Sequence, residues 1–227
     1  MSVVYKQIPL NLQLRAEATF DNFVSTGNEA LLHTLCASDE RYVYLWADEA
    51  GGKTHLLQAL CHQAHKAGKS AAFIPLLDDD ISEPEIFMGL ENLELVCIDD
   101  LHTIAGRPEW ETALFTLFNQ IRDNGGRLVI SARYAPNQTK IQLADLVSRL
   151  NWGVIFQICH LQDEDKIAVL QLRAGQSGLE LSKEVAEFML KHSPRDMANL
   201  FALLARLDTA SLTEQRRLTI PFVKQHL

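Results

Sequence analysis

The chain of 227 residues contains few cysteines and no cysteine pair. Its four cysteines are scattered and none belongs to a CxxC motif, so we expect buried, reduced thiols and neither a disulfide framework nor a zinc site. No apolar run is long enough to span a bilayer, and residues 1–6 lack the basic-then-apolar order of a secretory signal. The sequence therefore predicts a cytoplasmic protein without a membrane-spanning segment.

Positive charge is also scarce. Lys and Arg number 21 against 29 Asp and Glu, which gives a net charge of −8. A protein that binds DNA mainly through its surface needs clustered basic residues. Direct sequence-specific DNA recognition is therefore not expected, although a local basic patch stays open. The length allows one large domain or two small ones.

The stretch from Ala47 to Thr54 has the residues of a phosphate-binding loop. It follows an apolar run at 42–46, expected to be a buried strand, and precedes a helical pattern that begins at His55. Backbone N–H groups at a helix N-terminus attract anions, Lys53 would reach the outer phosphates, and the Thr54 hydroxyl would hold Mg²⁺. Ala47 replaces the usual first glycine, which the backbone allows only at negative φ. The pattern predicts nucleotide binding; a surface turn with a chance Gly-Gly-Lys is the alternative.

Apolar runs and helical periodicity alternate through the first 160 residues. Further strands are expected at 71–75, 93–98, 127–131 and 154–158. Helices are expected at 28–36, from the loop to 66, from a start capped by Ser82, at 109–122 and at 143–150. Only helices follow, at 163–176, 182–192, 197–207 and near the end of the chain. This order predicts an α/β protein with a mostly parallel sheet and a small all-helical subdomain.

Asp99 and Asp100 follow the apolar run at 93–98. Ligands of open parallel sheets sit at the carboxyl ends of the strands. One carboxylate there could complete the coordination of Mg²⁺, and the second could polarise an attacking water. Two solvated loop acids are the alternative.

Six stretches of the chain resemble the AAA+ ATPase module of the bacterial replication initiator DnaA, and most closely the short DnaA-homologous regulatory proteins of the Hda type. These stretches are residues 19–24, 52–57, 98–100, 131–134, 146–153 and 218–224. Ser-Arg-Leu-Asn-Trp-Gly at 148–153 is the most discriminating of them. The resemblance covers nearly the whole chain. It implies an AAA+ P-loop NTPase core with a five-stranded parallel sheet and an all-α lid. The expected division is an extended tail at 1–18, the nucleotide-binding subdomain at 19–159 and the lid at 160–227.

The resemblance also implies roles for individual residues. ADP or ATP would be held by Phe23, Val24, Ala50, Gly51, Gly52, Lys53, Thr54, His55 and Met197. Mg²⁺ would be held by Thr54 and Asp99, with Asp99 and Asp100 as the Walker B pair. Ser131 would belong to sensor I, although Ala132 stands where the family commonly has an acid. Arg149 would be an arginine finger that reaches a neighbouring subunit's nucleotide; a surface salt bridge is the alternative.

The lid departs from the family pattern. Ala198 stands where the family has an arginine that senses the γ-phosphate, and Arg195, one turn earlier, is the alternative candidate. Asp48 and Glu49 would also disfavour a triphosphate if their carboxylates face the phosphates. Weak or absent turnover of the protein's own ATP is therefore expected, with ADP as the ligand.

The N-terminal tail contains a short apolar pattern. On the residues alone it is either an edge strand or a peptide that docks into a partner's groove. Its resemblance to the peptide that binds the sliding clamp of DNA polymerase III (the beta subunit) implies contacts through Gln7, Ile8, Leu10 and Leu12, with Ile8 in place of the usual Leu.

Three functions remain open. The first is a clamp-bound regulator that stimulates hydrolysis of ATP on DnaA and so prevents re-initiation of DNA replication. The second is a self-acting ATPase that loads or remodels a replication protein. The third is a non-catalytic scaffold with a bound nucleotide. A homodimer or a higher oligomer is compatible with each.

Overall fold

The computed structural model describes residues 18–23, 25–37, 39–48, 51–79, 81–159, 161–194 and 197–227. Five parallel strands form one sheet in the order β2-β3-β4-β1-β5. They are β1 Tyr42–Trp46, β2 Ala71–Pro75, β3 Leu95–Asp99, β4 Arg127–Ala132 and β5 Val154–Gln157. The prediction of a five-stranded parallel sheet is confirmed, and each strand lies within two residues of its expected bounds.

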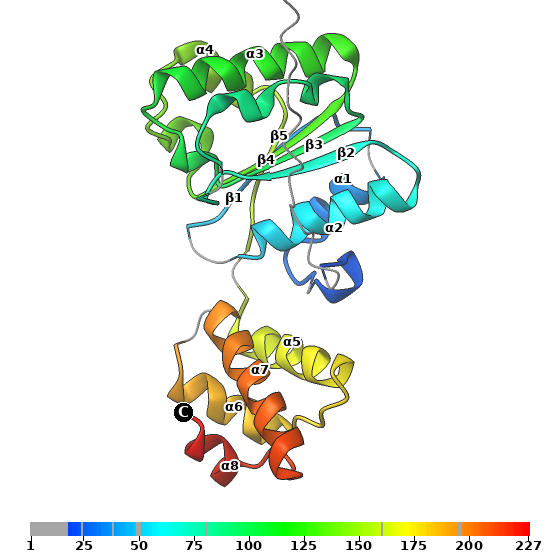
Figure 1. Ribbon diagram of the computed structural model, residues 1–227, viewed down its shortest axis with the longest axis vertical. Helices are drawn as coiled ribbons and strands as arrows, with labels where there is room; N and C mark the ends of the chain where they lie inside the picture. Colours follow the sequence, from blue (N-terminus) through cyan, green and yellow to red (C-terminus); the bar gives the residue numbers. More distant parts are fainter. Residues whose placement is uncertain are drawn as a thin grey trace, which may run out of the picture.

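Helices cover both faces of this sheet (Figure 1). One face carries α1 Glu29–Ala37 and α2 Lys53–Lys66, and the other carries α3 Pro108–Asn124 and α4 Ala144–Leu150. The α3 side is packed by apolar residues of α3 at helical spacing, namely Trp110, Leu114, Leu117, Phe118 and Ile121, all buried. Short 3₁₀ helices connect these elements: η1 Phe20–Asn22, η2 Pro84–Phe87, η3 Leu90–Asn92, η4 Leu101–Thr103 and η5 Pro136–Gln138.

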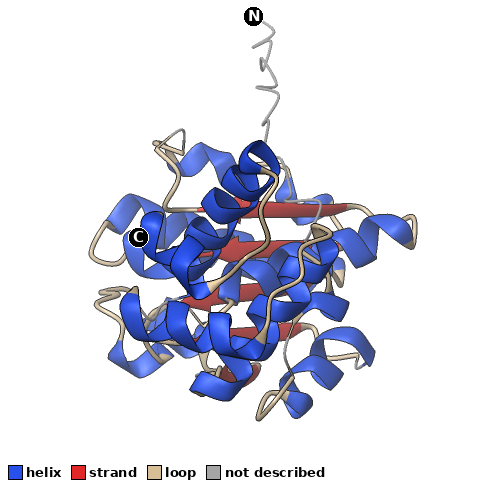
Figure 2. Ribbon diagram, turned by 90° about the horizontal axis from the view of Figure 1, so that it is seen from below, coloured by secondary structure: helices blue, strands red, loops and turns tan. Residues whose placement is uncertain are grey.

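The helical end of the chain has a hydrophobic core of its own. It consists of α5 Asp163–Gln176, α6 Lys183–His192, α7 Met197–Glu214 and α8 Ile220–Gln225. Leu170, Met189, Leu200 and Phe222 are fully buried between these helices. Figure 2 views the molecule from the side of these helices, with the strands of the sheet behind them. On the sheet side, α5 approaches η1. None of the helices in the described part of the chain is long and apolar enough to cross a membrane.

Two local predictions are wrong. Ser82 caps no α-helix, because only the four-residue 3₁₀ helix η2 forms here. The residue that precedes η2 is Glu83, and Gly89, with a φ of 87°, turns the chain soon after η2 ends. Cys61 and Cys97 are buried, but Cys36 is exposed in the last turn of α1 and Cys159 is exposed after β5. All four thiols are free, as expected. The predicted tail, apart from the buried Ala18, lies outside the described residues.

Candidate functional site

The loop between β1 and α2 needs glycine where the sequence has it. Gly52 has a φ of 81°, and a Cβ there would lie 2.9 Å from a ring carbon of Phe23. A Cβ at Gly51 would lie 3.0 Å from that of Ala47. Alanine can replace the usual first glycine only if its φ is negative, and Ala47 satisfies this. Among the described non-glycine residues, only Asp100 and Gln215 have positive φ. The described part of this loop, at Ala47, Asp48, Gly51 and Gly52, lies directly before the N-terminus of α2 and is called the loop cradle below. Ala50, expected to line it, lies outside the described residues.

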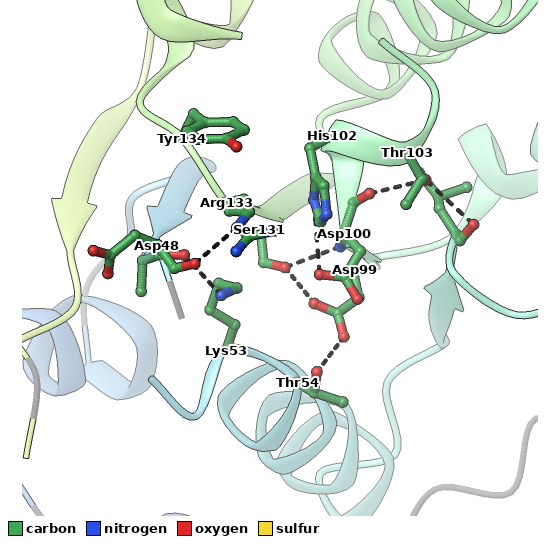
Figure 3. Close-up of polar contacts among 12 residues, drawn as sticks. Asp48, Lys53, Thr54, Asp99, Asp100, His102, Thr103, Ser131, Arg133 and Tyr134 are labelled. Carbon is green, nitrogen blue, oxygen red and sulfur yellow. Dashed lines mark hydrogen bonds and ion pairs between the residues drawn. The ribbon is translucent and has the colours of Figure 1, made fainter. Parts of the chain in front are cut away.

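Lys53 turns back toward this loop (Figure 3). Its Nζ donates a hydrogen bond of 2.9 Å to the carbonyl oxygen of Ala47. Burial lowers the pKa of Lys53, and the nearby carboxylates of Asp100 and Asp99 oppose that shift. The site thus contains a partly desolvated cation beside the helix N-terminus, which is an environment that favours an anion.

Three predicted site residues meet at the Asp99 carboxylate. The Thr54 hydroxyl donates to Asp99 Oδ2 at 2.5 Å, and the Ser131 hydroxyl donates to Asp99 Oδ1. The Asp99 carboxylate is buried, and this burial, together with the charge of Asp100, raises its pKa. Because Thr54 lies in the first turn of α2, Asp99 ends β3 and Ser131 lies near the end of β4, one carboxylate joins three elements. The paired hydroxyl and carboxylate oxygens are of the kind that Mg²⁺ prefers.

Asp100 adopts a left-handed conformation with a φ of 59°. Such a conformation is uncommon for a residue other than glycine and is typical of constrained sites. The backbone N–H of Asp100 donates a hydrogen bond of 3.1 Å to the hydroxyl oxygen of Ser131, and burial raises the pKa of the Asp100 carboxyl group. The Asp100 carboxylate lies beside that of Asp99 (Figure 3), and the charges of both carboxylates act on Lys53.

The sequence reasoning missed two residues of this site. His102 Nδ1 lies 3.9 Å from Asp100 Oδ1, is buried, and has no hydrogen-bond partner among the described residues. Burial lowers the pKa of His102. Arg133 Nε donates a hydrogen bond of 2.9 Å to the Asp48 carbonyl, next to the carbonyl that Lys53 contacts. The sequence signal that could have found them is their position: His102 lies two residues after Asp100, and Arg133 lies two residues after Ser131.

Aromatic residues border the loop on the side of η1. His55 Nε2 lies 2.7 Å from the Thr19 carbonyl oxygen, and its ring centre is 6.0 Å from that of Phe23. Since Phe23 also contacts Gly52, the predicted residues Phe23, Gly52 and His55 are brought together. Val24 lies outside the described residues.

Of the three lid residues named from the sequence, Met197 is the one whose side chain the structure describes. Met197, half-buried, packs on the core of the helical part. Arg195 lies outside the described residues, and the side chain of Ala198 is not described.

Arg149 lies at the opposite edge of the sheet from the loop. Its guanidinium carbon is 4.5 Å from the ring centre of Trp152, which in turn is 6.5 Å from that of Tyr42. Tyr42 is the first residue of β1, whereas the loop follows the last, so the length of the strand, about 15 Å, separates them. Among the described residues Arg149 forms no ion pair, which leaves the salt-bridge alternative without support there.

Two family models match the chain, one on each side of the connection between β5 and α5. The bacterial DnaA ATPase domain matches residues 14–157, and the lid domain of Hda matches residues 163–227. The chain belongs to the DnaA ATPase family. Its lid is of the Hda type, and the resemblance inferred from the motifs is confirmed.

Solved structures support the AAA+ fold. Domain III of the Thermotoga maritima replication initiator DnaA is 20% identical with a TM-score of 0.80, and the match covers 95% of this chain and 97% of that one. AMPPCP-bound DnaA from Aquifex aeolicus is 19% identical with a TM-score of 0.72, over 88% of this chain and 68% of that one. The Thermotoga maritima RuvB Holliday junction branch migration motor is 15% identical with a TM-score of 0.68, over 94% and 72%. At these identities the likeness shows the fold alone.

Proposed function

We propose that this chain is a regulatory AAA+ protein that stimulates the hydrolysis of ATP bound to the initiator DnaA and so prevents re-initiation of replication. The observation that carries the proposal is the place of Arg149. At the opposite end of the strands from its own loop, Arg149 is placed to meet a nucleotide held by another molecule rather than the chain's own. An AAA+ partner of the same family offers such a nucleotide, and membership in the DnaA family favours DnaA as that partner.

The chain's own site is proposed to hold an adenine nucleotide with Mg²⁺. The glycine cradle, Lys53 and the hydrogen-bonded pair of Thr54 and Asp99 fit phosphates and a hard cation. The related DnaA of Aquifex aeolicus binds AMPPCP, an adenine nucleotide analogue, which supports this choice. When bound, Mg²⁺ would neutralise part of the phosphate charge. Because the family's lid arginine is replaced by Ala198, ADP is the proposed resting ligand.

Arg149 would act by charge. Negative charge develops on the transferred phosphoryl group, and a guanidinium placed against it accelerates the reaction by on the order of 10³-fold or more. The chain's nucleotide would then hold the protein in the shape that docks on DnaA. The N-terminal peptide with Gln7, Ile8, Leu10 and Leu12 is proposed to tether it to the DNA-loaded sliding clamp.

A second candidate function rests on the intact carboxylate cluster. Asp99, Thr54 and Ser131 are assembled as a working ATPase would need them. If two copies of this chain associate, Arg149 of one copy could reach the nucleotide of the other. The protein would then be a self-acting ATPase that loads or remodels a replication protein.

Single-turnover hydrolysis on DnaA tests the proposal. DnaA from the same organism is loaded with γ-labelled ATP, and release of label is measured after addition of this chain and the clamp loaded on DNA. We expect Arg149→Ala to lose the stimulation while nucleotide and clamp binding persist. Arg107→Ala is the matched control, because Arg107 also covers an indole, 4.9 Å from the Trp110 ring centre, but at another site. Full stimulation by Arg149→Ala would overturn the proposal.

A further inference from the structure

Trp152 is an exposed indole with an arginine on it. The ring is 56% exposed, and the guanidinium carbon of Arg149 lies 4.5 Å from its centre. A second guanidinium, that of Arg122, lies 5.9 Å from the same ring centre. Guanidinium groups this close to an indole are attracted by the negative face of the ring. The Arg149 guanidinium also lies 6.0 Å from the ring centre of Phe115, so Trp152 is the nearer of two rings that hold this half-buried side chain.

The position of this indole is set by the backbone. A Cβ at Gly153 would lie 2.0 Å from the carbonyl oxygen of Tyr42, so only glycine lets the chain lie this close to the start of β1. The backbone N–H of Trp152 donates a hydrogen bond of 3.0 Å to the carbonyl oxygen of Arg149, and this bond closes the turn that follows α4. The indole and the arginine are thus fixed to one turn, and this turn is fixed to the sheet.

Two aromatic rings support the indole from the side of the sheet. The rings of Tyr42 and Phe118 stack with their centres 4.8 Å apart, and each centre is 6.5 Å from that of Trp152. Phe118 is buried, whereas more than half of the Trp152 surface faces outward. The indole adds little to the core, so it can be replaced without unfolding the protein.

We propose that Trp152 is a positioning residue for Arg149. The indole holds the guanidinium in one place beside the turn after α4 before a partner arrives, so less side-chain entropy is lost when Arg149 meets the partner's phosphates. This inference rests on the proposed function. It assigns no direct contact with the nucleotide to Trp152.

The test separates the rate of the reaction from the affinity of the complex. Label release from DnaA is measured over a range of chain concentrations with Trp152→Leu, which keeps an apolar side chain, and Trp152→Phe, which keeps an aromatic face. We expect Trp152→Leu to lower the maximal rate by about two- to fivefold, the size of a cation–π contact at an exposed site, with the half-saturating concentration unchanged. Trp152→Phe should recover most of the rate. Phe188→Leu, which removes a ring 5.5 Å from Lys224 Nζ in the lid, should change neither value.

A double-mutant cycle distinguishes this inference from the proposed function. If Trp152 acts through Arg149, Trp152→Leu should cause a smaller loss in an Arg149→Lys background, which keeps the charge but lacks the planar guanidinium. Three results would each overturn the positioning role. The first is a wild-type maximal rate for Trp152→Leu, and the second is an equal loss of maximal rate in Trp152→Leu and Trp152→Phe. The third is a change in the half-saturating concentration alone. If Arg149→Ala alone keeps full stimulation, the proposed function itself fails.

Discussion

The hydroxyl of Thr54 donates a hydrogen bond of 2.5 Å to the carboxylate of Asp99. The two residues are 45 positions apart in the sequence, one at the start of α2 and the other at the end of β3. Their contact joins the start of α2 to the end of β3 and places a hydroxyl and a carboxylate oxygen side by side. Because the carboxylate is buried, its negative charge lowers the free energy of unfolding, and a bound cation would offset this loss.

The first prediction concerns pH and the two carboxylates. Burial raises the folded-state pKa of Asp99 and of Asp100 above the ordinary value of 3.8. The folded protein therefore binds more protons than the unfolded chain, so the free energy of unfolding should fall as pH rises from about 4 through the raised values. Asp99→Asn should flatten this dependence and raise the unfolding midpoint of the nucleotide-free protein at neutral pH, by about 2–4 °C for each kcal/mol gained. Thermal unfolding of both proteins across this pH range is the measurement, and a lower midpoint for the variant would contradict it.

The second prediction concerns Lys53. Its ammonium group lies within the loop cradle and is partly desolvated, so it should make a charge-assisted contact with a phosphate. Lys53→Ala should weaken ADP and ATP binding by about 10–100-fold, measured by calorimetry. Lys66→Ala, at the exposed far end of the same helix, is the matched control and should bind as the wild type does. Equal affinities for all three proteins would remove Lys53 from the nucleotide site.

The third prediction compares two glycines. Gly153→Ala would place a Cβ 2.0 Å from the Tyr42 carbonyl oxygen, so β1 and β5 would have to separate. We expect a loss of more than about 3 kcal/mol in the free energy of unfolding. Gly175 in α5 has no atom within 4 Å of a built Cβ, and Gly175→Ala should stabilise by up to about 1 kcal/mol. Urea titration gives both values, and similar stabilities for the two variants would show that the close approach at Gly153 is not needed.

The fourth prediction concerns the N-terminal peptide. Replacing Gln7, Leu10 and Leu12 together by Ala should abolish binding to the isolated sliding clamp in surface plasmon resonance. Nucleotide affinity should not change, because the loop cradle is built from other residues. Replacing Asn11 and Gln13, which alternate with these positions, is the control and should leave clamp binding intact. Clamp binding by the triple variant would place the contact elsewhere in the chain.

Much of this architecture could be predicted from local patterns. Each strand is a short apolar run, and the loop is flanked by a strand and a helix, so the sheet and the cradle follow from the sequence. The meeting of Thr54, Asp99 and Ser131 also follows, because the carboxyl ends of parallel strands share one edge.

The parts that could not be predicted depend on contacts between distant segments. Glu111 is on the amphipathic helix α3, where a carboxylate usually faces solvent, but it is 1% exposed and accepts hydrogen bonds from the N–H groups of Gly106, Gln142 and Leu143. These groups belong to loops that only the fold brings to it. Arg133 likewise contacts a loop carbonyl 85 residues away. No periodicity in the sequence encodes such pairs.

The central claim is that Arg149 acts on DnaA's nucleotide and not on the chain's own. The test compares two reactions that differ in which protein carries the γ-labelled ATP. In one reaction γ-labelled ATP is bound to DnaA and unlabelled ADP to this chain; in the other, labelled ATP is bound to this chain and unlabelled ATP to DnaA. We expect fast release from labelled DnaA, lost with Arg149→Ala, and little release when the label is on this chain. Release of the chain's own label at an equal or greater rate would contradict it.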